Sequence, residues 1–323
     1  MKVLVTGGTG FIGSFVVEEL LRSHHEVMVV ANGRQFPSYL NSVIDRIGFY
    51  QCDFGDSDAL NNVLPGCDAV IHLAWSSIPK PTLGATGYEF TSNIISGINL
   101  IEKCIEHKIS KFVFISSGGT VYGIPTRIPI PESHELNPIS TYGLGKLTME
   151  KLLHLYHYSH GMKYSILRVS NAYGERQNIL KAQGVIAVWI KKILCGEPVE
   201  VWGDGQVVRD YVYVKDVAYA IVRALEDKAG RSVYNIGGGE GYSLNEILFK
   251  IEEVMNVRFD IIYKESRKFD VPVNILDISK ARKDLGFEPK TALHEGITII
   301  RDSLSEELSV APVRKDMLKI TAL

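Results

Sequence analysis

The sequence predicts an α/β protein built on a doubly wound parallel sheet, with a smaller α/β domain toward the C-terminal end. Three observations lead to this prediction. Strand-like and helix-like segments alternate through the first half of the chain, a glycine-rich turn follows the first strand-like segment, and the rhythm changes after Asn171. Alternation of this kind is typical of a parallel sheet that carries helices on both faces.

Six segments of the first half have the apolar pattern of strands. They are Lys2–Thr6, Glu26–Ala31, Ile47–Asp53, Ala69–Ala74, Lys111–Ser117 and Tyr164–Ser170. The nearly continuous apolar run Phe112–Ile115 indicates a strand that is buried on both faces of its sheet. Helical patterns fill most of the gaps, most clearly at Phe11–Ser23, Thr91–His107 and Thr141–Ser159.

The region after Asn171 contains more proline and glycine and shorter segments, as in 196–205. Two strands are predicted there, at Arg209–Val214 and Val233–Ile236, and we expect the stretch 207–237 to return to the first domain. The last residues lack clear periodicity and are expected to be partly disordered. The predicted division is therefore 1–171 with 207–237 for the first domain, 172–206 with 238–308 for the second, and 309–323 for a tail.

Composition and charge exclude several classes of partner. The 323 residues include 35 basic and 37 acidic side chains, which give a net charge of −2 without a long basic block. Nucleic acid and acidic membrane surfaces are therefore not expected as partners. No apolar run approaches the length of a membrane span, and the first residues already form a predicted core strand. Neither membrane insertion nor a signal peptide is expected.

The cysteines and histidines give no sign of a disulfide framework or a metal site. The nine histidines are scattered, and the pair His24–His25 is expected at a helix end, so no metal is predicted. The cysteines lie apart, without a CxxC spacing, and are expected to be reduced thiols in the cytoplasm. They are Cys52, Cys67, Cys104 and Cys195.

A glycine-rich turn links the first predicted strand to the first predicted helix. Its spacing is Gly7-x-x-Gly10-x-x-Gly13, which differs from the G-x-G-x-x-G of the classical dehydrogenases. Glycine lets the backbone approach a pyrophosphate closely, and a helix N-terminus offers free N–H groups and a positive dipole. An ordinary turn is the alternative interpretation, but the strand before it and the helix after it favour nucleotide binding.

Tyr142 and Lys146 are the main candidates for chemistry. They stand four residues apart on a predicted helix, so their side chains lie on one face, one turn apart. The lysine charge favours tyrosinate over tyrosine, and the phenol could then move protons near neutral pH. Pairs with this spacing are also common on ordinary helix surfaces, so the glycine-rich turn is what gives this pair its weight.

These motifs resemble the extended short-chain dehydrogenase/reductase family, in its nucleotide-sugar epimerase/dehydratase branch, and look most like UDP-glucose 4-epimerases. The resemblance runs from Met1 to about Arg301. It implies a Rossmann-type sheet, a C-terminal substrate domain, a UDP-sugar substrate and a cytoplasmic role in polysaccharide biosynthesis. It rests on 6–13 (TGGTGFIG), Asp53, His72–Ala74, 116–123 (SSGGTVYG), Tyr142 with Lys146, Arg168–Gly174, Arg209–Asp216, Tyr234–Gly237 and Arg267–Asp270.

The resemblance also implies a mechanism. A hydride passes from sugar C4 to a bound NAD while Tyr142, as phenolate, takes the O4 proton. The 4-keto sugar then turns over in the site, and the hydride returns to its opposite face. Lys146 would lower the tyrosine pKa and hydrogen-bond the nicotinamide ribose, and the cationic nicotinamide would lower that pKa further. NAD is then a recycled hydride store.

The sequence departs from the family at a third catalytic position. In 4-epimerases a serine or threonine three residues before the Val-Tyr-Gly motif hydrogen-bonds O4, and here that position is Gly118. Thr120 is predicted to supply the missing hydroxyl, directly or through a water, with Ser117 as the second candidate. The alternative is that both hydroxyls only satisfy loop backbone, and the sequence favours neither interpretation.

The same loop separates the chain from related enzymes. Nucleotide-sugar 4,6-dehydratases place an Asp-Glu pair at Gly119–Thr120, and UDP-glucuronate decarboxylases place a glutamate at Thr120. Without an acid, neither reaction has an obvious agent here. The predicted activity is C4 inversion of UDP-glucose or UDP-galactose, or of a UDP-N-acetylhexosamine. The alternatives are an NAD(P)H-dependent deoxysugar-nucleotide reductase, a UDP-uronic acid 4-epimerase, and a non-catalytic dinucleotide sensor, against which Tyr142 and Lys146 count.

The end of the second strand bears on the choice of cofactor. NAD-specific members of the family end that strand with an acid, but here it is followed by Asn32-Gly33-Arg34. Asn32 could bind the adenosine ribose, whereas Arg34 could bind the 2′-phosphate of NADP or be an ordinary loop cation. NAD is predicted, with NADP as the alternative. The resemblance implies further cofactor contacts at Gly7, Gly10, Phe11, Ile12, Gly13, Asp53, Phe54, Leu73, Ala74, Asn93, Tyr142 and Lys146.

Besides Thr120, the resemblance implies substrate contacts at five positions from Asn171 onward. Arg209 and Arg267 match residues that bind the UDP phosphates, where arginines form charge-assisted hydrogen bonds. Asn171 matches a residue on the diphosphate, and Asp270 one near the uridine ribose. Asn274 falls where a bulky tyrosine in some 4-epimerases excludes N-acetylated sugars, so a smaller side chain could admit them. A homodimer is also implied, through the predicted helices 91–107 and 141–159.

Overall fold

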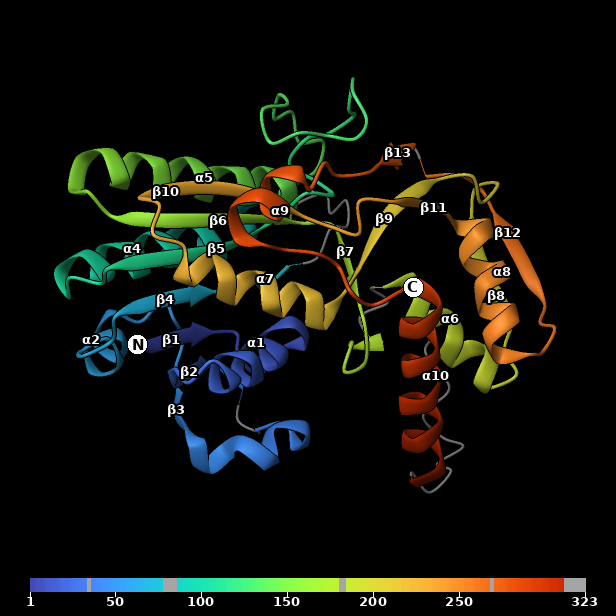
Figure 1. Ribbon diagram of the computed structural model, residues 1–323, viewed down its shortest axis with the longest axis horizontal. Coiled ribbons are helices and arrows are strands. Elements are labelled where there is room, and N and C mark those ends of the chain that lie inside the picture. Colours follow the sequence, from blue (N-terminus) through green and yellow to red (C-terminus); the bar gives the residue numbers. More distant parts are fainter. Residues whose placement is uncertain (34–35, 78–85, 180–183, 268–269, 311–323) are drawn as a thin grey trace.

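Seven parallel strands form one sheet in the order β10-β6-β5-β4-β1-β2-β3 (Figure 1). The computed structural model describes residues 1–33, 36–77, 86–179, 184–267 and 270–310. The strand order turns back between β1 and β4, as in a doubly wound Rossmann-type sheet, so the predicted fold class is confirmed. The strands are β1 (Lys2–Thr6), β2 (Glu26–Ala31), β3 (Ile47–Gln51), β4 (Ala69–His72), β5 (Lys111–Ser117), β6 (Lys163–Val169) and β10 (Arg231–Ile236).

Helices cover both faces of this sheet (Figure 1). Val3 and Val5 of β1 pack into the core under one face, whereas Leu4 packs into the core under the other. Successive side chains of a strand point to opposite faces, which explains why these strands are apolar along their whole length. The helices are α1 (Phe11–Arg22) and α7 (Val214–Glu226) on one side, and α2 (Ser57–Val63), α4 (Ser96–Glu106) and α5 (Thr141–His160) on the other.

The predicted elements of this half are confirmed to within two residues, with one exception. β1, β2 and β5 begin and end at the predicted residues. The exception is the helix predicted over 91–107, which begins earlier and is interrupted. It consists of α3 (Thr86–Glu89), a π-helical segment (Phe90–Ile95) and α4. Single wide turns of this kind often occur at functional sites, and no glycine or proline in the sequence marks this one.

A smaller lobe is built around β9 (Val208–Tyr213). β9 pairs with three short strands, and a separate pair of strands lies beyond them, next to α8 (Figure 1). No helix in the described ranges is long and apolar enough to cross a membrane. The lobe contains β7 (Asn171–Tyr173), β8 (Val199–Trp202), β11 (Gly241–Ser243), β12 (Ile261–Lys264), β13 (Val273–Asn274), α6 (Val185–Leu194), α8 (Leu244–Met255) and α10 (Leu293–Val310). A 3-10 segment (Ser38–Arg46) and α9 (Ser279–Leu285) complete the described elements.

The stretch 207–237 contributes to both parts of the molecule. β10 is the edge strand of the large sheet, beside β6, whereas β9 belongs to the sheet of the smaller lobe. Within 207–237, β9 is therefore the part that does not join the large sheet. The predicted domain division stays a prediction. Of the predicted tail, 309–310 end α10 and 311–323 lie outside the described residues.

The buried carboxylate of Asp210 joins the two sheets. It accepts hydrogen bonds from the N–H groups of Gly238 and Leu276, at 2.6 and 3.1 Å, and from the Ser170 hydroxyl at 3.1 Å. Ser170 and Gly238 follow the carboxyl ends of β6 and β10, so β9 is fixed against the edge where parallel sheets of this type bind ligands. Burial raises the pKa of Asp210 to about 6, and these three hydrogen bonds oppose that shift.

Candidate active site

The glycine-rich turn forms a cradle at the switch point of the sheet. Gly7 has a φ of +72°, and a Cβ atom there would lie 2.8 Å from the Ala74 nitrogen. A Cβ on Gly13 would lie 2.1 Å from the Gly7 carbonyl oxygen, so no side chain fits at either position. α1 begins at Phe11, directly after Gly10, and no side chain caps its first N–H groups. The turn therefore offers bare backbone donors of the kind that binds a pyrophosphate.

Three further predicted cofactor residues lie along the same edge of the sheet. Leu73 and Ala74 follow β4, and their N–H groups donate to the carbonyl and the hydroxyl of Thr6, at 3.1 and 3.4 Å. Asn93 of the π-helical segment is fully buried and accepts a hydrogen bond from the Ser76 N–H at 2.9 Å. Its side-chain nitrogen has no partner in the described structure, so it offers a free donor for a ligand.

The remaining cofactor candidates lie around the ends of β2 and β3. Phe54 packs edge-on against the buried His72, with 5.1 Å between ring centroids. The Asp53 carboxylate accepts a hydrogen bond from the Gly55 N–H at 2.8 Å, and Asn32 is exposed just after β2. Arg34 lies outside the described residues, so the structure gives no information on its part in NADP binding.

Tyr142 and Lys146 lie in the first two turns of α5. Ser140 caps this helix, because its hydroxyl accepts the Gly143 N–H at 3.1 Å. The Lys146 ammonium lies 5.6 Å from the centre of the Tyr142 ring and donates to the Ile115 carbonyl at 2.8 Å. The helix thus places both groups beside the end of β5, as the spacing predicts.

Burial shifts the pKa values of both Lys146 and Tyr142. The Lys146 side chain is 3% exposed, and burial lowers its pKa to about 7, although Glu89 and Glu150 act in the opposite direction. Burial also raises the pKa of Tyr142, and the nearby Glu89 carboxylate adds to this rise. The sequence predicted a lysine that favours tyrosinate. Within the protein alone, burial outweighs that effect, so a further positive charge is needed to ionise the phenol at neutral pH.

Two residues that the sequence interpretation did not include, Trp75 and Glu89, complete the surroundings of the pair. The Trp75 ring centre lies 3.7 Å from the Lys146 ammonium and 6.2 Å from the centre of the Tyr142 ring. The indole N–H donates to the buried Glu89 carboxylate at 2.8 Å. The one feature of the sequence that could have pointed to Trp75 as a site residue is its position directly after the His72–Ala74 motif.

The loop after β5 explains why position 118 carries no side chain. A Cβ atom on Gly118 would lie 2.5 Å from a methyl group of Leu276 and 3.0 Å from the Arg168 carbonyl oxygen. Thr120 lies against α5, because a Cβ on Gly143 would come within 2.7 Å of its carbonyl oxygen. The Thr120 hydroxyl is buried and has no partner in the described structure, whereas Ser117 is partly exposed. Thr120 is therefore the buried candidate donor of this loop, and Ser117 the more accessible one.

Three of the predicted substrate residues lie on adjacent strands of the smaller lobe. Arg209 of β9 faces Asn274 of β13, and Asn171 of β7 donates to the Asp210 carbonyl at 3.0 Å. The buried Asn274 side chain donates to the Gly118 carbonyl at 3.1 Å, and its oxygen has no partner in the described ranges. Asn274 therefore joins the substrate lobe directly to the loop that carries Thr120.

The two arginines have different surroundings. Arg209 donates to the carbonyl groups of Val208 and Val271, and burial lowers its pKa while the Asp270 carboxylate raises it. Arg267 is exposed and stacks on the Trp202 ring, 4.2 Å from its centre. The structure therefore brings Arg209 and Asp270 together, whereas Arg267 contacts a different part of the lobe.

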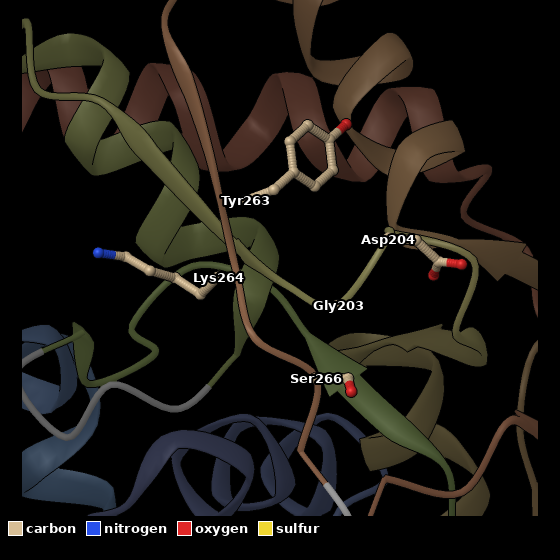
Figure 2. A pocket seen from close by; sticks show the side chains of 5 residues that line it. All are labelled: Gly203, Asp204, Tyr263, Lys264 and Ser266. Carbon is tan, nitrogen blue, oxygen red and sulfur yellow. The ribbon is translucent and has the colours of Figure 1, made fainter.

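An open hollow of about 640 Å³ lies beside the C-terminal ends of the paired strands β8 and β12. Figure 2 shows that the Tyr263 and Asp204 side chains lie to one side of the ribbon of β12, whereas the Lys264 side chain points to the other. Gly203 and Ser266 complete the lining. Gly203 directly follows Trp202 in the chain, and Ser266 directly precedes Arg267. The hollow therefore adjoins the stacked Trp202–Arg267 pair and includes none of the residues around Tyr142. Among the described residues, no cluster of histidine, cysteine or acidic side chains could hold a metal ion.

The fold and this site together define a dinucleotide-binding enzyme of the extended short-chain dehydrogenase/reductase class. Residues 3–237 match the NAD-dependent epimerase/dehydratase family, and the chain belongs to that family.

Similar proteins agree with this assignment over nearly the whole chain. A UDP-glucose 4-epimerase of Mycolicibacterium smegmatis is 33% identical over 302 residues, which cover 92% of this chain and 96% of the relative. The crystal structure of a Thermotoga maritima UDP-glucose 4-epimerase with UDP-glucose has a TM-score of 0.90 at 36% identity, covering 95% of this chain and 100% of that one. A Thermus thermophilus UDP-glucose 4-epimerase in complex with NAD has a TM-score of 0.86 at 33% identity, over 94% and 99% of the two chains.

Proposed function

We propose that the protein is a nucleotide-sugar 4-epimerase, which inverts C4 of a UDP-hexose with a bound NAD. The observation that carries the proposal is the Tyr142–Lys146 pair beside a hydroxyl loop that contains no carboxylic acid. Removal of a proton from O4 needs a base such as Tyr142, whereas dehydration or decarboxylation would need an acid in that loop. The activities named for the similar proteins support the same reaction.

The residues of the site fit NAD. The side-chain-free cradle of Gly7 and Gly13 and the unpartnered nitrogen of Asn93 are what a dinucleotide requires. When bound, NAD would accept a hydride from C4, return it, and add a positive charge near the phenol. NADP stays an alternative through Arg34, and analysis of the nucleotide released from the purified protein distinguishes the two.

Each catalytic residue has one role in the proposal. Tyr142 takes the O4 proton from one sugar and returns it to the epimer. Lys146, as ammonium, stabilises the phenolate and holds the cofactor ribose. Thr120 donates its free hydroxyl to O4, in place of the side chain that Gly118 lacks, and Ser117 is the second candidate for this task.

The smaller lobe would bind the nucleotide end of the substrate. Arg209 and Arg267 would hold the phosphates, with Asn171 on the diphosphate and Asp270 near the ribose. Asn274 would lie beside the sugar and leave room for an N-acetyl group. A UDP-uronic acid is the alternative substrate, which makes the choice of sugars in the assay important.

We also propose that the protein is a homodimer through α4 and α5. Large apolar side chains are exposed on α5 and on the π-helical segment that leads into α4, with Tyr158 87%, Leu155 55% and Ile95 60% accessible. Light scattering should give twice the chain mass, and Tyr158→Glu with Leu155→Glu should give the monomer.

A cytoplasmic role in supplying sugars for polysaccharide synthesis belongs to the same proposal.

One experiment tests the proposed activity. The purified protein is incubated with a panel of UDP-sugars, namely glucose, galactose, their N-acetylated forms and glucuronic acid, and the products are separated by chromatography. Interconversion of a C4 pair without a change in absorbance at 340 nm is expected. Consumption of added NADH or NADPH would indicate the reductase instead. Binding of the dinucleotide without any conversion would indicate a sensor.

A further inference from the structure

We propose that Trp75 and Glu89 are positioning residues, which hold Lys146 as an ammonium group beside the catalytic tyrosine. The proposal rests on the proposed function and adds to it the two residues that control the charge of the lysine. Neither touches the reacting atoms in this role. Trp75 acts on the lysine through the face of its ring, and Glu89 acts on the ring through a hydrogen bond.

Aromatic faces replace most of the hydrogen bonds that a buried ammonium needs. An ammonium has three donors, and among the described residues Lys146 uses one, toward the Ile115 carbonyl. The Trp75 ring lies 3.7 Å from the nitrogen, nearer than the Phe114 ring at 5.0 Å. A cation over an indole face is stabilised by the ring quadrupole, most strongly where water is excluded. The remaining donors stay free for a ligand.

Glu89 fixes the plane of the indole. Its carboxylate is 3% exposed and accepts the indole N–H at 2.8 Å, so a ring rotation would leave a buried charge unpaired. Gly145 of α5 makes room for this arrangement. A Cβ atom there would lie 3.1 Å from the carboxylate and 3.2 Å from the indole. Glycine is unfavourable within a helix, which indicates that this space is needed.

The other charged groups around Lys146 have partners or are neutral. Glu150, on the next turn of α5, forms a salt bridge with Arg168 at 2.7 Å. His72 of β4 is fully buried, and burial and the nearby lysine lower its pKa to about 3, so it carries no charge at neutral pH. Tyr142 is the group that Lys146 serves. Glu89 and the Trp75 face therefore favour the ammonium against its burial, together with Glu150, whose charge is also paired with Arg168.

Substitution of Trp75 tests the proposal through the pH dependence of turnover. Turnover should fall on the alkaline side where Lys146 loses its proton. Without the ring face the ammonium is less stable, so Trp75→Leu should move this limb to lower pH by about one unit. It should also lower kcat about tenfold at pH 8, with KM for the UDP-sugar unchanged. Trp75→Phe keeps a ring face and should keep the limb near its original pH.

Glu89→Gln keeps an acceptor for the indole but removes the charge. It should move the alkaline limb in the same direction as Trp75→Leu, because the carboxylate favours the ammonium. If Trp75→Leu and Trp75→Phe lower kcat equally without moving the limb, the indole only fills space and the proposal is wrong. An unchanged kcat and limb in Trp75→Leu would refute it as well.

A second measurement does not need turnover. The charge 3.7 Å from the indole should change the fluorescence of Trp75 as Lys146 titrates. The wild-type emission should therefore show a transition near pH 7 that Lys146→Met lacks. Identical titrations in the two proteins would contradict the proposal. If no UDP-sugar is converted but the transition is present, the proposed function fails while the positioning of the lysine stands.

Discussion

Lys146 and Glu150 lie one turn apart on α5, and both are buried, but their surroundings differ. Glu150 accepts hydrogen bonds from the Ser116 hydroxyl and, at 3.1 and 2.7 Å, from two guanidinium nitrogens of Arg168. Lys146 has one hydrogen bond and aromatic faces instead. The Glu150 charge is fully paired, whereas the Lys146 ammonium keeps donors that no described residue uses. Glu150 therefore stabilises the fold, and Lys146 can act on a ligand.

The surroundings of each residue extend this contrast. Arg168 also donates to the Tyr122 hydroxyl at 3.0 Å, which in turn donates to Asn235 at 2.7 Å, so the network around Glu150 is closed. By contrast, the Thr120 hydroxyl, in the loop next to α5, and the oxygen of Asn274, which contacts the same loop, have no partner in the described structure. Buried polar groups are normally satisfied, so a group of unpaired ones marks the place where a ligand completes the bonding.

The largest expected effect is on turnover, and it comes from the group of residues around Lys146 that can act on a ligand. Tyr142→Phe removes the proposed proton carrier, and the phenol makes no hydrogen bond to any other residue that the structure describes. Turnover should fall about 10³-fold, in the range of a general base, with the melting temperature unchanged. Product analysis and calorimetry on the same sample measure both. A variant that loses its stability together with its turnover would place Tyr142 with the structural groups instead.

Glu150→Gln tests the paired side. It leaves the buried Arg168 without a counter-charge, which should cost about 3–5 kcal/mol of unfolding free energy in urea denaturation. The folded fraction should keep most of its turnover. The matched control Glu150→Met with Arg168→Met removes both charges and should recover much of the stability. A loss of turnover without a loss of stability would contradict the structural role.

The pH dependence of stability should distinguish the two charges as well. Burial lowers the pKa of Lys146 to about 7, whereas an unfolded lysine keeps its ordinary value of 10.5. Between these values the unfolded chain binds a proton that the folded chain lacks, so stability rises with pH. From pH 7 to 9 the gain is at most about 3 kcal/mol. Lys146→Met should lack this rise in denaturation curves, and a parallel rise in both proteins would contradict the shift.

Thr120→Val should give the smallest effect. The substitution is nearly isosteric and removes a buried hydroxyl without a partner, so stability should be unchanged or slightly higher. Loss of one donor to O4 should lower kcat about tenfold, or about 1.4 kcal/mol. Ser117→Ala is the control and should change kcat less. Full activity in both variants would show that neither hydroxyl of this loop donates to O4 in a way that matters for turnover.

The features that could be predicted from the sequence depend on local spacing. The glycine turn, the strands around it and the Tyr142–Lys146 pair each lie within a few neighbouring residues. Trp75 and Glu89 could not be predicted in the same way, because they meet across a 14-residue separation and no motif links them. The missing hydroxyl at Gly118 was visible, but its cause, Leu276 in the space of the side chain, comes from a segment far along the chain.

The wide turn at Phe90–Ile95 has a consequence for how this site can change. A π-helical turn holds about one residue more than an α-helical turn, and each residue of an α-helix rotates the next by about 100°. A single deletion there would convert the wide turn into an ordinary α-helical turn, so that Glu89 before it and the core residue Leu100 after it would keep their faces. The length of the chain at this turn can therefore change by one residue without moving Glu89 away from Trp75 or Leu100 away from the core.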